Sequence, residues 1–142
     1  MFAFLLQDWL TVRGSSPVAV AQSEPFWLDM SGYKDLVTWL EVKEFTATAG
    51  SLYVQAQTSP SKDEALFQSM TGNVAVAAGV TTTNLLSDMA LVPLARWLRW
   101  QLVPTATATS WDITFRLWVT ASRPGRAAVR SPLASLARAL AL

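Results

Sequence analysis

The feature that most constrains the fold is a strict alternation of apolar and polar residues at positions 111–121. One set of alternating positions is apolar, namely Trp111, Ile113, Phe115, Leu117 and Val119. The interleaved set is mostly polar, namely Asp112, Thr114, Arg116, Trp118 and Thr120. A period of two is the repeat of an extended strand, because successive side chains point to opposite faces. This segment is therefore expected to be a β-strand with its first set facing a core.

The same alternation recurs at residues 51–58 and 96–103, where Leu52 and Val54 in the first segment and Leu98 and Leu102 in the second fall on one face. Further short strands are expected at residues 5–12, 18–22, 25–30, 35–46, 65–70, 73–77 and 81–86. Turn-forming Gly, Pro and Ser residues separate them. Many short strands in a chain of 142 residues predict an all-β single domain, an antiparallel β-sandwich of jelly-roll-like form.

Three regions are expected along the chain: an N-terminal arm or edge strand at 1–16, the sandwich at 17–121, and a tail at 122–142. Within the tail, Ser131 and Pro132 are typical of a helix start. Leu133, Leu136 and Leu140 recur at helical spacing and form one apolar stripe. A helix of about ten residues is marginal alone in water, so this short C-terminal helical arm is expected to dock on a protein surface.

The charge balance is unusual because charged residues make up only 15% of the chain, whereas apolar residues make up 51%. Apolar surface in excess of a small core favours an oligomeric interface. The tail is basic, with four arginines and no acid: Arg123, Arg126, Arg130 and Arg138. These could neutralise phosphates, but no aromatic residue is interleaved with them to stack on bases. A solvated or protein-docked arm is therefore favoured over nucleic-acid binding.

Several kinds of catalytic chemistry are excluded by residues that the chain lacks. It has no histidine and no cysteine, so thiol nucleophiles, imidazole bases and a Ser-His-Asp triad are excluded. Gly72 and Gly79 lack the spacing of a phosphate-binding loop. Glu41 and Glu44 differ in parity, so they are expected on opposite faces of a strand. We expect no enzyme activity, cofactor or metal, and a glycosidase with distant carboxylates is the weakest alternative.

No membrane segment is expected, because the apolar stretches fall short of the roughly 18 residues that a spanning helix needs. Residues 1–6 are apolar but lack the basic residues that open a signal peptide. We interpret them as part of an edge strand or of an arm that packs on a neighbour.

Seven tryptophans are the other unusual feature of the composition. Trp39, Trp100 and Trp111 are expected in the core, whereas Trp97 and Trp118 have outward parity and are candidates for a partner or ligand. The candidate partner interface comprises Trp97, Arg99, Arg116, Trp118, Leu133, Leu136 and Leu140. The alternative is a carbohydrate-binding sandwich that uses Tyr53, Trp97, Arg99 and Trp118.

Three short motifs between residues 27 and 121 carry a family resemblance. Asp29-x-Ser31-Gly32-Tyr33 leads into a strand, Gln57-Thr58-Ser59-Pro60 ends one, and Trp97-x-Arg99 precedes the last hairpin. In this order they resemble small β-sandwich structural proteins of tailed phages and prophages. The chain departs from that pattern after Pro60, and its basic tail has no counterpart in it.

The resemblance implies a virion component, either a capsid decoration (cement) protein or a minor head or tail protein. Such a protein would be assembled in the host cytoplasm and would stabilise the shell. Its expected partners are the major capsid protein, other virion proteins and further copies of itself, with a trimer favoured.

Overall fold

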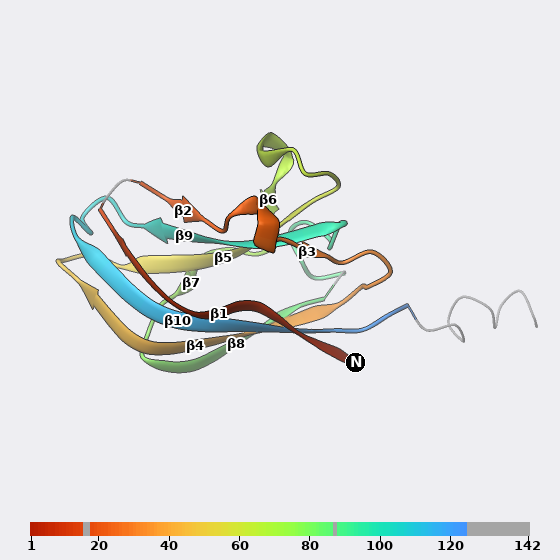
Figure 1. Cartoon of the computed structure of the whole chain (residues 1–142), viewed down its shortest axis with the longest axis horizontal. Coiled ribbons are helices and arrows are strands. Elements are labelled where there is room, and N and C mark those ends of the chain that lie inside the picture. Colours follow the sequence, from red (N-terminus) through yellow and green to blue (C-terminus); the bar gives the residue numbers. More distant parts are fainter. Residues whose placement is uncertain (16–17, 87, 125–142) are drawn as a thin grey trace, which may run out of the picture.

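The computed structural model describes residues 1–15, 18–86 and 88–124, and these residues fold as a sandwich of two antiparallel sheets (Figure 1). The predicted all-β, sandwich-like single domain is confirmed. The helical arm predicted within residues 122–142 lies outside the described residues, except for positions 122–124, which belong to no helix or strand.

The sheet that we call sheet A has four strands in the order β1-β10-β4-β8. Their bounds are Phe2–Gly14 for β1, Trp111–Ala121 for β10, Leu36–Ala47 for β4 and Gly79–Leu85 for β8. β1 and β8 are the two edge strands, so the N-terminal segment lies along one edge of this sheet.

The second sheet, sheet B, has six strands, most of them very short. Its central pair is β9 (Trp97–Pro104) and β5 (Leu52–Ser59). Two-residue strands flank this pair, with β2 (Val20–Ala21) and β3 (Leu28–Asp29) on β9 and with β6 (Gln68–Ser69) and β7 (Val74–Ala75) on β5.

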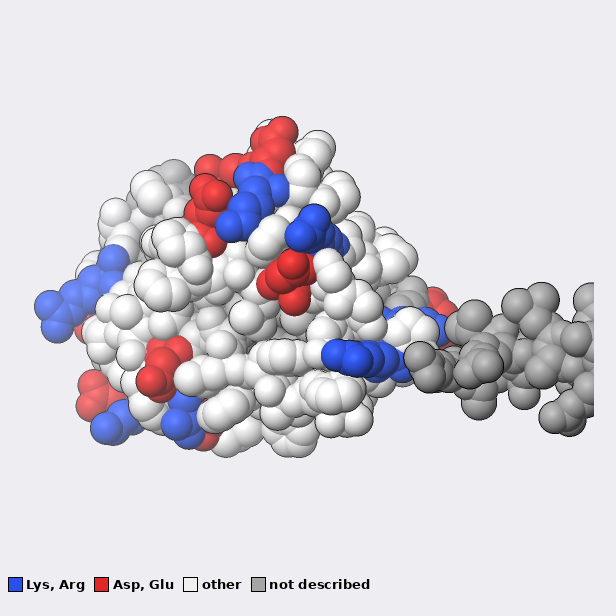
Figure 2. Space-filling model, turned by 45° about the vertical axis from the view of Figure 1, so that its right-hand side comes forward, with Lys and Arg blue, Asp and Glu red and all other residues white. Residues whose placement is uncertain are grey.

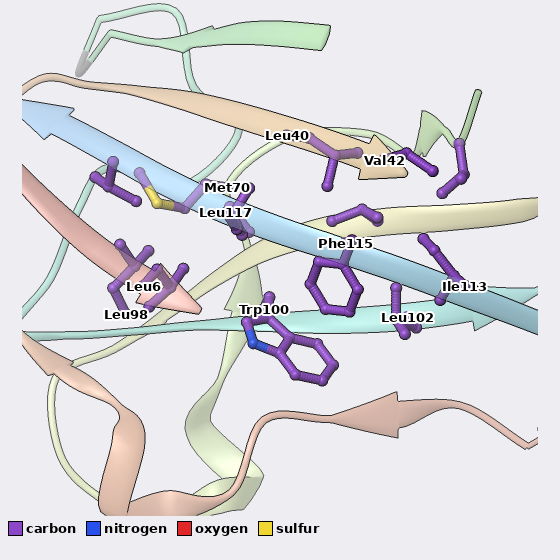
Figure 3. Packing of buried hydrophobic residues seen from close by; sticks show 14 of the residues in the cluster. Leu6, Leu40, Val42, Met70, Leu98, Trp100, Leu102, Ile113, Phe115 and Leu117 are labelled. Atoms are coloured by element: carbon purple, nitrogen blue, oxygen red, sulfur yellow. The ribbon is translucent and has the colours of Figure 1, made fainter. Parts of the chain in front are cut away.

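The core lies between the sheets and is built from the alternating positions that the sequence indicates. Ile113, Phe115 and Val119 of β10 are fully buried. Figure 3 shows the Ile113 and Phe115 side chains beside Trp100 and Leu102 of β9. The Trp100 ring packs edge-on against the Phe115 ring with centroids 5.1 Å apart, a favourable aromatic geometry. The core positions predicted for Trp100 and Trp111 are therefore confirmed.

Two predicted strands are in part 3₁₀ turns, which is a correction. Residues 25–30 contain the turn η1 (Glu24–Phe26) before the short strand β3, and residues 65–70 lie similarly across η2 (Glu64–Leu66) and β6. The ring of Pro25 fixes its φ angle near the helical value, which suits a position at the start of the first turn. In the second turn, the Asp63 carboxylate caps the N-terminal end by accepting a hydrogen bond from the backbone N–H of Ala65.

A β-bulge at Lys43 corrects the expected placement of two carboxylates. Val42 lies opposite Phe115, but Glu44 lies opposite Thr114, so Lys43 is the extra residue. The shift moves Glu44 onto the outer face of sheet A, the face that Glu41 also occupies. The expectation that the two point to opposite faces is therefore wrong.

A search of the described residues finds no helix that is long and apolar enough to cross a membrane.

Candidate interaction face on sheet A

Exposed tryptophans gather on the outer face of sheet A, the face turned away from sheet B. Trp39 lies directly opposite Trp118 in the β4–β10 register, and Leu5 of β1 lies opposite Trp118 on its other side. Trp9 and Trp39 are 44% and 41% exposed, which is high for the largest side chain. We call the set Leu5, Trp9, Trp39, Val80 and Trp118 the tryptophan face.

The core position expected for Trp39 is wrong. The buried residues of the first half of β4 are Leu36, Thr38, Leu40 and Val42, so position 39 points outward. Its indole Nε1 donates a hydrogen bond to Thr120 Oγ1 at 3.1 Å, which satisfies its one polar group at the surface. Trp39 therefore belongs to the exposed set.

An ion pair lies among these rings. Arg116 Nε donates to Glu41 Oε2 at 2.6 Å. The guanidinium carbon lies 4.7 Å from the centroid of the Trp9 ring and 5.7 Å from that of the Trp118 ring, within cation–π range. The charges of Arg116 and Glu41 therefore compensate each other in the middle of an aromatic surface.

Both members of this pair are held in their charged forms. The hydrogen bond from Arg116 lowers the pKa of Glu41, and a hydrogen bond from Trp118 adds to the effect. The same contact with Glu41 raises the pKa of Arg116. Each charged form is favoured because its partner is close by, so the pair persists as an ion pair at neutral pH.

An open hollow of about 320 Å³ lies beside the pair. Aromatic, aliphatic and charged groups line it, namely Ala3, Trp39, Glu41, Val80, Arg116, Trp118 and Thr120. A hollow with two indoles and a few convergent hydrogen-bonding groups suits one inserted side chain or one sugar ring.

The predicted interface residues divide between the two sheets. Trp118 and Arg116 lie together on the tryptophan face, as their parity indicates. Trp97 is on the outer face of sheet B, where Lys62 Nζ lies 4.5 Å and the Arg96 guanidinium 5.2 Å from the centroid of its ring. Leu133, Leu136 and Leu140 lie outside the described residues, as do three of the four tail arginines: Arg126, Arg130 and Arg138.

Arg99, another of the candidate interface residues, is buried. It has the outward parity of its strand, but only 5% of it is exposed. The turns η1 and η2 place the rings of Trp27 and Phe67 over it, with centroids 5.4 and 4.1 Å from the guanidinium. Its Nε donates to Gln57 Oε1 at 2.9 Å, and its charge pairs with Glu64 at 3.3 Å.

The alternative carbohydrate set does not form one site. Trp118 is on sheet A, whereas Tyr53, Trp97 and Arg99 are on sheet B. Tyr53 lies opposite Val103 and Trp97 lies opposite Ser59, at the two ends of the β5–β9 pair. At about 3.3 Å per residue these ends are about 20 Å apart. Any sugar site of this chain must therefore use another group of residues.

The two segments whose rings cover Arg99 share a spacing of residues in the sequence. Residues 24–30 and 64–70 share an acid, then an apolar residue, an aromatic ring and a methionine at the same intervals. In both copies the aromatic residue, Trp27 or Phe67, contributes to the cover, and the methionine, Met30 or Met70, is buried in the core. Comparison of these two segments could have indicated two similar turns, but not that their rings meet over Arg99.

Comparisons with known proteins give remote likenesses. No protein-family model and no curated protein sequence matches the chain. Among solved structures, one of the infectious bursal disease virus Gx strain is 11% identical over 88% of this chain and 32% of that chain, with a TM-score of 0.46. A structure of the infectious bursal disease virus VP2 subviral particle is 11% identical over 88% of this chain and 33% of that chain, with a TM-score of 0.47. This chain thus spans about a third of those viral chains.

A structure of FLHE is 21% identical over 86% of this chain and 98% of that chain, with a TM-score of 0.47. At these identities and TM-scores, none of the likenesses assigns a function to the chain.

Proposed function

We propose that the chain is a structural protein of a virion, a capsid decoration or minor head protein that binds the shell and other copies of itself. The observation that carries this proposal is the tryptophan face. Tryptophan and arginine are the residues most enriched at the energetic centres of protein interfaces. Here Trp9 and Trp118 flank Arg116, Trp39 lies opposite Trp118, and the charge of Arg116 is already compensated by Glu41.

The surface electrostatics support the same reading. Charged side chains lie in small separate groups, and most of the visible surface is uncharged (Figure 2). Burying the tryptophan face would desolvate a paired charge rather than an isolated one, which lowers the cost of binding. A partner side chain could fill the hollow between Trp39 and Trp118. On this proposal the chain binds proteins and does not catalyse a reaction.

The resemblance motifs have structural roles that fit a sandwich of this type. The Asp29 carboxylate accepts from both the amide and the hydroxyl of Ser31, which shapes the turn that leads into β4. Thr58 Oγ1 donates to the Trp97 carbonyl and ties the end of β5 to β9. The motifs thus stabilise the turn before β4 and the end of the β5–β9 pair, and the tryptophan face carries the proposed binding.

The direct test is the stoichiometry of purified particles from the host that makes this chain. Quantitative mass spectrometry is expected to find the chain at a fixed ratio to the major capsid protein. In a binding assay to particles that lack the chain, Trp118→Ala is expected to weaken binding about 30-fold or more, as for an interface anchor. Trp97→Ala, on sheet B, is the matched control and should bind as the wild type does. A chain absent from particles would contradict the proposal.

A second candidate is carbohydrate binding in the hollow of the tryptophan face. It is favoured by one observation, the position of Trp39 and Trp118 next to the polar groups of Arg116, Glu41 and Thr120. An indole face can stack on a sugar ring while such groups bond its hydroxyls. A glycan array should then show binding that Trp118→Ala removes. Glycan binding by a chain that is absent from particles would select this candidate over the first.

A further inference from the structure

The edge strand β8 is unprotected on one side. It runs Gly79-Val80-Thr81-Thr82-Thr83-Asn84-Leu85 and pairs with β4 in unbroken register from Leu85 opposite Leu36 to Gly79 opposite Val42. Within the described residues, no strand pairs with its other side. An edge of this kind presents a row of backbone N–H and C=O groups that another strand can bind.

The opposite edge of the same sheet has the usual protection. The register of β1 shifts twice, between Leu5 and Gln7 and again between Gln7 and Leu10, and β1 carries Asp8 and Arg13. Bulges and charges at an edge discourage pairing with another chain. β8 has no proline, no charged residue and no bulge. The two edges of sheet A therefore differ in their capacity to bind a further strand.

We propose that β8 pairs antiparallel with β8 of a second copy, which joins the two copies of sheet A into one continuous sheet. A two-fold axis through such a contact makes each strand meet its own sequence in reverse. In a register centred on Thr82, Thr82 lies opposite Thr82 and Thr81 lies opposite Thr83. Cross-strand threonine pairs are favourable, and the absence of charge means that no like charges meet. This self-compatibility favours a second copy as the occupant.

The surface beside the edge would extend the contact. Val80 is 64% exposed and lies next to Glu41, while Thr82 lies next to Trp39. Pairing of β8 would bring these outward side chains of both copies together and align the two tryptophan faces on one side of the joined sheet. This inference rests on the self-association in the proposed function. The copies would meet through β8, and the contact between them would have two-fold symmetry.

The test uses opposite charges at one position of the full chain. Thr82 is exposed on the outer face, so Thr82→Lys and Thr82→Glu should leave the fold intact, as checked by circular dichroism and thermal unfolding. By native mass spectrometry and sedimentation, the wild type is expected to be a dimer. Each variant alone is expected to dissociate at least about 10-fold more readily, because like charges then face each other. Mixing the two variants should restore a dimer of one Lys chain and one Glu chain.

The matched control is Gln68→Lys, which adds the same charge at an exposed position on sheet B and should remain a dimer. As a second measurement on the wild type, the amides of β8 should become protected from hydrogen exchange as concentration rises. A monomeric wild type, a dimeric Thr82→Lys chain, or a mixture that restores nothing would each overturn the inference. A wild-type monomer that still enters particles would overturn the inference alone. A β8 dimer that never enters particles would overturn the proposed function alone.

Discussion

Arg116 and Glu41 face each other across β10 and β4 and share a hydrogen bond of 2.6 Å on the outer surface of sheet A. Their register positions are directly opposite, so the backbone of the sheet sets the contact. Trp9 packs on the guanidinium and holds it over the sheet. A charged pair fixed in this way gives an aromatic surface a defined orientation for a partner without giving it a net charge.

This pair should control how Glu41 titrates. Replacing Arg116 by Met removes the hydrogen bond and the positive charge that lower the pKa of Glu41, so that pKa should rise toward or above its ordinary value. Carboxyl ¹³C NMR of the full chain would measure it. Lys43→Met, at an exposed position of the same strand, is the control and should leave the Glu41 pKa much closer to that of the wild type. An unchanged Glu41 pKa in Arg116→Met would rule out the arrangement.

Acid stability should depend on Asp29. Hydrogen bonds from the Ser31 side chain and amide, and then from Arg96, lower the pKa of Asp29 from 3.8 to about 2. Because the folded pKa is the lower one, the unfolded chain binds the proton first as the pH falls. The stabilisation is therefore complete well above pH 3.8 and is lost as the pH falls toward about 2.

Urea unfolding midpoints across that window would test this dependence. The difference between the wild type and Asp29→Asn should shrink as the pH decreases. Ser31→Ala removes the first donor and should reduce the pH dependence, and Arg96→Met should reduce it less. A constant difference between wild type and Asp29→Asn would contradict the assignment.

A glycine in the β4–β5 connection should resist substitution. Gly50 has φ +68°, and a Cβ built there meets Thr105 Oγ1 and Thr107 Oγ1. Gly50→Ala should cost about 1–3 kcal/mol of unfolding free energy from backbone strain and crowding. Gly32→Ala, with φ +82° but open space, should cost about 1 kcal/mol. Gly72→Ala, which has neither constraint, should lie within about 0.5 kcal/mol of wild type in denaturant unfolding.

The buried Arg99 should matter more for folding than the exposed arginine three positions before it. Arg99→Met keeps much of the volume between Trp27 and Phe67 but leaves the buried Gln57 amide oxygen without its donor. We expect a loss of about 1–3 kcal/mol in unfolding free energy, measured by denaturant titration. Arg96→Met should lose less, since Arg96 lies on the surface. Equal losses in the two variants would mean that the covered guanidinium is not a structural element.

Strand β10 was predictable because it lies in the interior of sheet A with only one face against the core. Its alternation from Trp111 to Val119 therefore reports burial directly. Strand β4 has the same position in the sheet but was harder to interpret. Its outer face carries Trp39 within the tryptophan face, and the bulge at Lys43 changes the parity halfway along, so apolar residues occur on both sides.

Other features depend on contacts between distant segments. Parity places Arg99 on the outer face of sheet B, but its burial requires Trp27 and Phe67 to meet above it. The unprotected side of β8 depends on the order of strands in sheet A, which the alternation within Gly79–Leu85 does not report. The assembly of Trp9, Trp39 and Trp118 on one face likewise depends on which strands are neighbours, so the sequence indicated Trp118 alone.

The uneven exposure of the indoles gives the protein an intrinsic fluorescence reporter. Trp9 and Trp39 are exposed to water on sheet A and should emit at longer wavelengths, whereas Trp27, Trp100 and Trp111 are buried and should emit at shorter wavelengths. A molecule that binds to sheet A would shield Trp9 and Trp39 from an aqueous quencher and shift the emission spectrum toward shorter wavelengths. A molecule that binds to sheet B would leave Trp9 and Trp39 accessible to the quencher. The side on which a partner binds can thus be determined without attaching a dye.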